Sequence, residues 1–423
     1  MRKLPFIAII AAALLCSAES YAQRQLNREL SNWESTFSEL ADMDSDIQGF
    51  IKDWRIKGLS LSVMRNDSLL FARGYGWADK EKNIKTSPGT TMRIASVSKL
   101  LTSVGIMVLQ ERGQLKLSDK VFGKDGILSE YTNYIIDSAA FNITVENLLR
   151  HEGGFDERGG DPMFMPQTIS RNLGLSGPPS PDDICKYVLR RPLRFYPGSS
   201  QDYSNFSYLL LSMVIEKVTG SEYELWMQEN VLYPAGCFDM HICNNYYEEK
   251  FPSETRYYMP AGSGLSSEFN GSGRRVEHPY GGADYTTLSG GGAWIASTPE
   301  LARLVASIDA RGCVEDIISN ESVQDMTRYY DNHIFPLGWI SASPWYGWTR
   351  TGTLSSTHAI IRYYPDGECW IVLVNTGSGR GSAFSARELR ALCDHCRENY
   401  SYLLPARNLF KDPATSHPSP DRR

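Results

Sequence analysis

The sequence predicts an α+β fold, an α/β sandwich in which an antiparallel sheet built from both chain ends is flanked by helices and interrupted by a mainly helical region. The first observation is a pair of alternating runs, Gly58–Arg65 and Ser68–Trp77, separated only by Asn66-Asp67, a pattern typical of a hairpin. The second is a group of three further alternating or apolar runs near the other end: Gly338–Thr349, His358–Tyr364 and Cys369–Asn375. Strands at both ends with helices between them favour one shared sheet.

Helical spacing of apolar residues predicts helices over residues 26–54, from Ser96 to about Gly113, and over Ser382–Asn399. We expect one domain over residues 26–400. Its sheet part comprises about 50–115 and 285–400, and the helical insert about 116–284. Residues 411–423 have almost nothing to bury and are predicted to be a disordered tail.

Composition restricts the classes of partner. The 423 residues are 42% hydrophobic and 22% charged, with a formal net charge of −6, as in an ordinary folded protein. No basic face is expected that would attract nucleic acid or an anionic membrane. No stretch is long and apolar enough to span a bilayer. A monomer is expected.

The first residues predict export. Arg2 and Lys3 precede an apolar run, Leu4–Leu15, and Ser20-Tyr21-Ala22 supplies small residues at the two positions that a signal peptidase reads. We therefore expect a signal peptide over residues 1–22, cleavage after Ala22, and a secreted or periplasmic protein. A lipoprotein anchored through Cys16 is the alternative.

The cysteines predict neither a metal site nor a complete disulfide framework. Seven of the eight remain after cleavage, and an odd number cannot pair completely. Cys237 and Cys243 are close enough in sequence to pair. Cys393 and Cys396 form a single C-x-x-C with no second pair to complete a zinc site. No metal and no cofactor are expected.

The first chemical motif is Ser96-Val97-Ser98-Lys99, where an extended stretch, Met92–Ala95, meets a helix. Free N–H groups at a helix N-terminus favour developing negative charge. Residues three apart share a helix face, so Lys99 can reach the Ser96 hydroxyl. A lysine whose pKa is lowered can take the proton of that hydroxyl. Ser96 is the candidate nucleophile and Lys99 its activating partner; the alternative is a capping serine and a solvated lysine.

Tyr203-Ser204-Asn205 is the second motif, a phenol that can relay a proton and an amide that can orient substrate. Tyr131-Thr132-Asn133 and Tyr330-Asp331-Asn332 have the same form. Only Tyr203 follows a tight-turn signal, at residues 195–198, and leads directly into an apolar helix, Phe206–Val218. Tyr203 and Asn205 are therefore preferred.

Arg350-Thr351-Gly352-Thr353 is the third motif and lies beside a predicted strand. An arginine is permanently charged, and its planar fork fits a carboxylate. We expect Arg350 to bind a substrate carboxylate, and Thr351, Gly352 and Thr353 to belong to the same substrate site. The alternative is that Arg350 points away from the cleft and braces the loop.

In order and spacing, the three motifs resemble those of the penicillin-recognising serine enzymes: class C β-lactamases, D-alanyl-D-alanine carboxypeptidases and their esterase relatives. The resemblance covers about residues 50–377. It includes Leu148–Gly154, similar to the LL-x-H-x-x-G loop of the family, and Gly290–Ser297. It implies a β-lactamase/transpeptidase-like fold. Arg350 stands where the family usually has Lys or His, and the Tyr-type second motif argues against a class A β-lactamase.

The same resemblance implies roles for the motif residues. Ser96 would be acylated, Lys99 and Tyr203 would move protons, and Asn205 would contact the substrate. The backbone N–H groups of Ser96 and Thr353 would form an oxyanion hole.

The expected function is that of an exported serine hydrolase that cleaves an amide or ester through an acyl-enzyme on Ser96. The substrate would be a small molecule or a peptidoglycan-derived peptide, and β-lactam, D-amino-acid peptide and small ester all stay open. The alternatives are a penicillin-binding sensor that is acylated without turnover and an inactive binding relative. An α/β-hydrolase would require a G-x-S-x-G elbow, which the sequence lacks.

Overall fold

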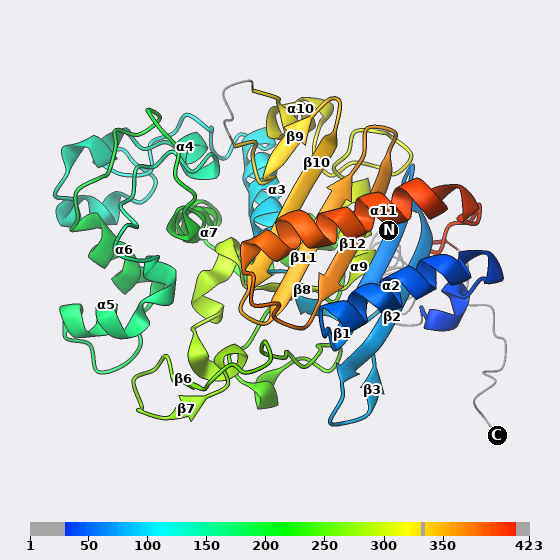
Figure 1. The fold of residues 1–423 in the computed structure, drawn as a ribbon. Coiled ribbons are helices and arrows are strands. Elements are labelled where there is room, and N and C mark those ends of the chain that lie inside the picture. Colours follow the sequence, from blue (N-terminus) through cyan, green and yellow to red (C-terminus); the bar gives the residue numbers. More distant parts are fainter. Residues whose placement is uncertain (1–29, 331–334, 412–423) are drawn as a thin grey trace, which may run out of the picture.

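A computed structural model describes residues 30–330 and 335–411 of the chain (Figure 1). The predicted signal peptide lies outside these residues, as does the predicted tail apart from Lys411. Within the described residues, no helix is both long and apolar enough to cross a membrane.

A seven-stranded antiparallel sheet forms the centre of the described structure, with the strand order β3-β2-β1-β12-β11-β10-β9 (Figure 1). Three strands come from the N-terminal part of the chain and four from the C-terminal part, which confirms the predicted α+β fold. The strands are β1 (Gly58–Arg65), β2 (Ser68–Asp79), β3 (Ile84–Lys85), β9 (Ser341–Ser343), β10 (Gly347–Leu354), β11 (Thr357–Tyr363) and β12 (Glu368–Val374).

The predicted hairpin of β1 and β2 is confirmed. Asn66 and Asp67 both have positive φ, 45° and 58°, as the two-residue turn favoured in hairpins requires. The strand predicted over Gly338–Thr349 is wrong in its bounds, because β9 and β10 are two strands joined at Pro344. Gly347 has φ 74°, and a Cβ there would lie 2.0 Å from the Tyr363 carbonyl oxygen. The sharp turn therefore needs a glycine.

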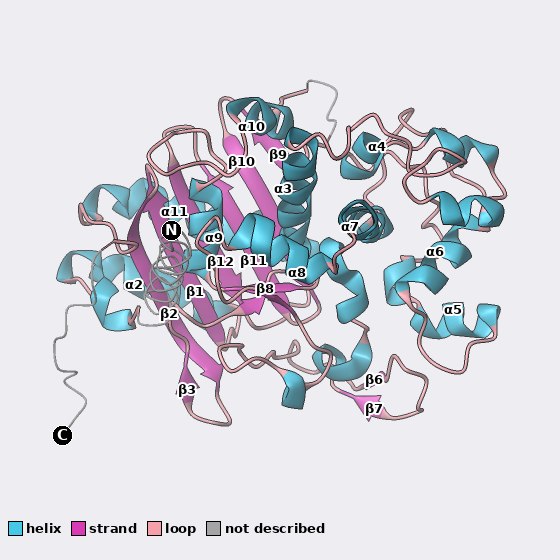
Figure 2. Cartoon of the chain, turned by 180° about the vertical axis from the view of Figure 1, so that it is seen from behind, coloured by secondary structure: helices cyan, strands magenta, loops and turns pink. Residues whose placement is uncertain are grey.

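Helices cover both faces of the sheet. α2 and α11 lie across one face (Figure 1), and α3 and α9 lie on the other (Figure 2). Alternation in β1 matches this arrangement: Leu59 and Leu61 belong to the core under α2 and α11, whereas the Ser60 and Ser62 hydroxyls contact Thr298 of α9. The helices here are α2 (Ala41–Asp53), α3 (Ser98–Glu111), α9 (Thr298–Ala306), α10 (Asn320–Thr327) and α11 (Arg390–Tyr400).

The helix predicted over residues 26–54 begins only at Ala41. Residues 32–35 instead form a single 3₁₀ turn. Asn32 accepts a hydrogen bond from the Gly74 N–H (2.7 Å), and the Ser35 hydroxyl accepts one from the Ala72 N–H (3.0 Å). These side chains bind the backbone of β2, and such tertiary contacts override the helical pattern of the sequence.

The chain between α3 and the return to the sheet forms a group of helices, with α4 to α7 at one side of the sheet (Figure 1) and α8 against the sheet next to α3 (Figure 2). These are α4 (Val145–Leu149), α5 (Pro166–Leu173), α6 (Pro181–Leu189), α7 (Asn205–Thr219) and α8 (Tyr223–Met227). A small sheet of β4 (Met92–Arg93), β8 (Trp294–Ala296) and β5 (His241–Ile242) lies beside the start of α3, and a hairpin of β6 (Ser266–Ser267) and β7 (Arg275–Val276) lies further along. The N-termini of α3 and α7 and the strand β10 carry the three motifs.

Candidate active site

Ser96 lies in a tight turn between β4 and α3. Ala95, just before it, has φ 50°, a left-handed conformation that is unfavourable for alanine and is found mainly where the surroundings enforce it. The preceding Ile94 N–H donates to the Trp294 carbonyl of β8 (2.9 Å), which fixes the turn. Between residues 91 and 100, Ser96 alone is not buried. The turn therefore presents the Ser96 side chain outward from a rigid core.

Lys99 is fully buried in the first turn of α3. Its Nζ donates to the Ser96 hydroxyl (3.3 Å), Asn205 Oδ1 (2.6 Å) and the Gly291 carbonyl (2.5 Å). Burial lowers the pKa of Lys99, and the positive charge of Arg350 lowers it further, although Tyr203 opposes the change. A lysine amine with a lowered pKa beside a serine hydroxyl can act as a general base.

Tyr203 lies beside the same pair of residues. The Lys99 Nζ is 4.9 Å from the centre of the tyrosine ring. Burial opposes ionisation of the phenol, but the charges of Lys99 and Arg350, with hydrogen bonds to Ser96 and Lys99, outweigh it and bring the pKa of Tyr203 to about 8. The phenol can therefore exchange a proton near neutral pH.

His151, in the segment Leu148–Gly154, holds Tyr203 in place. The two rings stack with their centres 4.4 Å apart. The His151 carbonyl accepts from the Asp202 N–H (2.9 Å), and Nδ1 accepts from the Ser204 N–H (3.1 Å). Burial and the charges of Lys99 and Arg350 keep the pKa of His151 well below its usual value, so this imidazole is neutral and serves as a hydrogen-bond acceptor.

Asn205 begins α7 and connects Lys99 to a carboxylate. While Oδ1 accepts from Lys99, Nδ2 donates to Asp161 Oδ2 (2.6 Å). The other oxygen of Asp161 accepts from the Met163 N–H (2.9 Å). Because a carboxylate can only accept, Asp161 fixes the orientation of the Asn205 amide and keeps Oδ1 toward Lys99.

Arg350 is almost completely buried, with 1% of its surface exposed. Its Nε donates to the Ser96 carbonyl (2.7 Å) and its Nη2 to the Tyr203 hydroxyl (3.0 Å). The sequence left two alternatives for Arg350: binding a substrate carboxylate, or pointing away from the cleft and bracing the loop. The observed placement matches neither completely. The guanidinium faces the site but binds the two reactive segments of the protein, so the geometry favours a bracing role over binding of a substrate carboxylate.

The rest of the third motif belongs to β10 itself. Thr351 and Thr353 pair with Ile360 and His358 of β11. A Cβ on Gly352 would lie 2.1 Å from the Ile94 carbonyl oxygen. Glycine therefore allows β10 to pack against the Ser96 turn, and the roles of these three residues toward substrate stay predictions.

The structure thus brings Ser96, Lys99, Tyr203, Asn205 and Arg350 together from α3, the N-terminus of α7 and β10. A hydroxyl, an amine and a phenol lie in mutual contact, and the amine and the phenol both have lowered pKa values. Such a group can activate a nucleophile and return a proton to a leaving group.

Comparison with known proteins agrees with this arrangement. The Beta-lactamase family model matches residues 43–394. The chain is a member of the Beta-lactamase family. Among its relatives, the putative penicillin-binding protein PbpX of Bacillus subtilis is 26% identical over 50% of this chain and 48% of its own length. The protein Flp of Staphylococcus aureus is 28% identical over 45% of this chain and 36% of its own length. The matches cover less than half of each of these curated relatives.

Solved structures confirm the fold expected of a Beta-lactamase family member. FmtA from Staphylococcus aureus superposes with a TM-score of 0.63 at 18% identity, covering 92% of this chain and 97% of its own. The D-amino acid amidase of Ochrobactrum anthropi has a TM-score of 0.64 at 19% identity, with coverage of 86% and 99%. A penicillin-binding protein homologue from Pyrococcus abyssi, described as octameric, has a TM-score of 0.63 at 23% identity, with coverage of 84% and 77%. The monomer predicted here stays a prediction.

Two supporting residues of this Beta-lactamase family site were not identified from the sequence. Asp161 is 44 positions from Asn205 and has no motif of its own. The carbonyl of Gly291 accepts from Lys99, although the segment Gly290–Ser297 was noted only as a family resemblance. His151 lay within a recognised motif, but its contacts with the Tyr203 segment needed the structure.

The described residues contain no cluster of three or more His, Cys, Asp or Glu side chains that could hold a metal ion. All seven described cysteines are free thiols. Cys237 and Cys243, which the sequence left open as a pair, are both buried and unpaired, and so are Cys393 and Cys396.

Substitution of Asp161 by asparagine should lower kcat. The amide introduced by Asp161→Asn can donate as well as accept, so it no longer fixes the Asn205 amide, and a flip would turn an N–H group toward Lys99. Losing a charge-assisted contact costs about 1.5–3 kcal/mol, roughly a 10–150-fold loss of kcat. Steady-state kinetics measures the loss, and Asp161→Glu is the control for charge. An unchanged kcat in Asp161→Asn would exclude the positioning role.

Substitution of Arg350 by alanine should slow carboxylate-bearing and neutral substrates to the same extent. The variant loses two hydrogen bonds within the protein, so its effect does not depend on substrate charge. Removal of the cation should also raise the pKa of Tyr203 and move the rising limb of the pH–kcat/KM profile to higher pH. The measurement compares a β-lactam or D-peptide with a neutral ester from mildly acidic to mildly alkaline pH. A loss confined to the carboxylate substrates would restore the carboxylate-binding hypothesis.

Proposed function

We propose that this protein is a serine hydrolase that cleaves amide or ester bonds through an acyl-enzyme on Ser96. The observation that carries the proposal is the buried Lys99 amine, held between the Ser96 hydroxyl and Asn205 and lowered in pKa by burial. A surface lysine that merely follows a capping serine would be solvated and charged. Membership of the Beta-lactamase family supports the same interpretation.

In the proposed reaction, Ser96 Oγ attacks the carbonyl carbon while its proton passes to Lys99 or Tyr203. Charge develops on the carbonyl oxygen, toward the backbone N–H groups of Ser96 and Thr353. The stored proton then passes to the leaving amine or alcohol, and the acyl group stays on Ser96. A water molecule attacks the ester and gives its proton to the same base. The base then returns a proton to Ser96 Oγ as the bond to the acyl group breaks, which releases the acid product and free Ser96.

Arg350 supports both steps in this proposal. It donates to the Ser96 carbonyl and the Tyr203 hydroxyl, and its fixed charge favours the ionised form of the phenol. The site therefore keeps the pKa of Tyr203 close to neutral pH, so that the phenol can both take up and release a proton. Export to the periplasm or the cell exterior, with a small molecule or a peptidoglycan-derived peptide as substrate, completes the proposal.

Intact-mass spectrometry tests the proposal. The protein is incubated separately with a labelled penicillin, a D-Ala-D-Ala peptide and a p-nitrophenyl ester, and samples are quenched over time. We expect an acyl adduct with at least one of them, located by peptide mapping on Ser96, followed by its decay as product accumulates. An adduct that never decays would identify an acylated sensor instead. An adduct on another serine, or none with any substrate, would contradict the assignment.

A further inference from the structure

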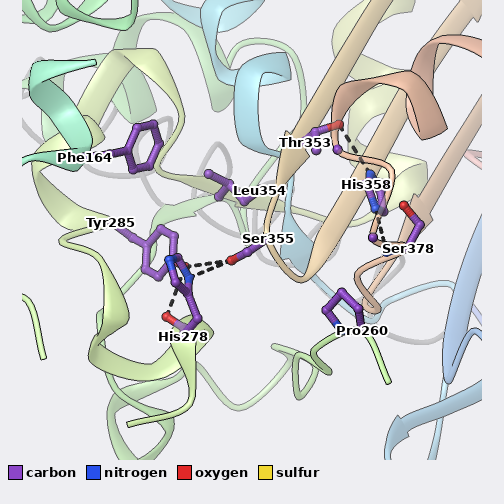
Figure 3. Close-up of a pocket in the computed structure, with 11 residues that line it drawn as sticks. Phe164, Pro260, His278, Tyr285, Thr353, Leu354, Ser355, His358 and Ser378 are labelled. Carbon is purple, nitrogen blue, oxygen red and sulfur yellow. Dashed lines mark hydrogen bonds between the residues drawn. The ribbon is translucent and has the colours of Figure 1, made fainter. Parts of the chain in front are cut away.

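A pocket of about 380 Å³ lies at the C-terminal end of β10 (Figure 3). It begins at Thr353 and extends to Ser355 in the turn after the strand. Thr353 follows Gly352, which packs directly against the turn carrying Ser96. A substrate bound at Ser96 and extending along β10 therefore enters this pocket.

One wall of the pocket is a hydrogen-bonded group of His278, Tyr285 and Ser355. The Ser355 Oγ lies 2.7 Å from His278 Nδ1, and the Tyr285 hydroxyl lies 3.0 Å from the same nitrogen. Figure 3 shows the three side chains together on one side, with Thr353 and His358 on the other. The Tyr285 hydroxyl also donates to the His278 carbonyl (3.2 Å). In the tautomer in which Ser355 donates to Nδ1, the ring proton of His278 lies on Nε2. The group then offers both a donor and an acceptor.

The pocket is polar but carries no fixed charge. Among its described lining residues there is no Lys, Arg, Asp or Glu. Burial lowers the pKa of His278, with a contribution from the Arg93 charge, and burial lowers the pKa of His358 to about 4. Both imidazoles are therefore neutral near pH 7. A charged substrate group would lose hydration here. The Arg93 guanidinium lies behind the lining, 4.2 Å from the centre of the Tyr285 ring, but it is buried and already has Glu254 at 3.9 Å as its counter-charge.

Arg350 does not supply a positive charge to this pocket. Its guanidinium donates to the Ser96 carbonyl and the Tyr203 hydroxyl and is 1% exposed. Phe164 and Pro260 add apolar surface to the lining. The lining thus combines apolar surface with paired neutral donors and acceptors, a combination that matches a carboxamide or hydroxyl on an aliphatic chain.

We propose that this pocket binds the acyl side of the substrate and selects neutral hydrogen-bonding groups through Ser355, His278 and Tyr285. The inference rests on the proposed function and narrows it, because it favours amide or hydroxyl side groups over free carboxylates. The acyl part is the occupant we commit to because it stays attached to Ser96 through both chemical steps, whereas the leaving group must escape.

The test uses three p-nitrophenyl esters of equal chain length, made from adipamic, adipic and heptanoic acid, which end in a carboxamide, a carboxylate and a methyl group. For the wild-type protein we expect kcat/KM for the adipamate to exceed that for the adipate at least tenfold. Ser355→Ala should lower the adipamate value roughly 3–10-fold, as for one neutral hydrogen bond. It should leave the heptanoate value unchanged. Tyr285→Phe, which keeps the buried ring, should act in the same direction.

Two results would overturn the proposal. One is a wild-type preference for the adipate, which would indicate a cation or a protonated histidine in the pocket. The other is an equal loss on all three esters in Ser355→Ala, which would indicate a structural role. The heptanoate is the control within each variant, and near-ultraviolet circular dichroism verifies that each variant is folded.

A binding experiment tests the pocket independently of the proposed hydrolase activity. The Ser96→Ala variant is titrated with the p-nitroanilides of adipamic and adipic acid by isothermal calorimetry. Tighter binding of the adipamic compound, weakened again in Ser96→Ala/Ser355→Ala, supports the pocket even if the wild-type protein hydrolyses none of the esters. Absence of that preference contradicts the pocket assignment, whatever the hydrolytic activity.

Discussion

Substitution of Ser96 by alanine is expected to lower kcat/KM by roughly 10⁴-fold or more, as removal of the nucleophile does in other serine hydrolases. The acyl-enzyme cannot form without the Ser96 oxygen, and no other group in the described site lies where that oxygen does. The protein should still fold, because the hydroxyl is only partly buried and its neighbours Lys99 and Tyr203 keep their other contacts. Steady-state kinetics and intact-mass spectrometry with a labelled penicillin measure the effect.

Ser98 supplies a matched control two residues away. Its hydroxyl is fully buried and accepts from the Trp294 N–H (3.2 Å). Ser98→Ala should therefore reduce the free energy of unfolding by about 1–3 kcal/mol, the cost of an unsatisfied buried donor. Acylation per folded molecule should be retained. If Ser98→Ala abolished labelling, or Ser96→Ala kept it, the nucleophile would be misassigned.

The local parts of the fold were predictable because short-range patterns determine them. The hairpin after Gly58 follows from alternation and from two turn residues that tolerate positive φ. The helix from Ser98 follows from apolar spacing. The nucleophile and Lys99 follow from the same helix, since positions three apart share a face.

Bounds that depend on tertiary contacts were missed. Residues 32–35 satisfy the backbone of β2 and so leave the helical pattern that their apolar neighbours suggest. The break at Pro344 depends on how Gly347 passes the Tyr363 carbonyl. The first contact leaves no trace in the local sequence, whereas Pro344 and Gly347 are turn residues that the prediction of one continuous strand passed over.

The direction of Arg350 was also beyond the sequence. In β10, Arg350 and Gly352 share one face, and the sequence does not say whether that face meets substrate or the Ser96 turn. The structure places the nucleophile turn against it. Arg350 therefore contacts two reacting segments of the protein, and its binding of a substrate carboxylate stays a prediction.

Lys99 allows proton transfer to be separated from simple charge stabilisation. Lys99→Arg keeps a positive charge in the site but removes the base, because arginine does not lose its proton in proteins. We expect kcat/KM to fall roughly 10²–10⁴-fold, the range for general acid–base catalysis. Lys99→Met, which is close to lysine in volume and carries no charge, should fall at least as far. Labelling of Ser96 followed over time measures both variants.

The pH dependence of kcat/KM separates the two Lys99 variants, because the direction in which the rising limb moves depends on the charge at position 99. Wild-type kcat/KM should rise with pH as the site loses a proton. It should reach half of its plateau near pH 8, the pKa of Tyr203, and level off above that pH. The Lys99 charge lowers that pKa, so its removal in Lys99→Met should move any residual rising limb to higher pH. Lys99→Arg should leave the limb in place and lower only its plateau. If Lys99→Arg kept most of the wild-type activity, proton transfer through Lys99 would be excluded, and Tyr203 would be the remaining base.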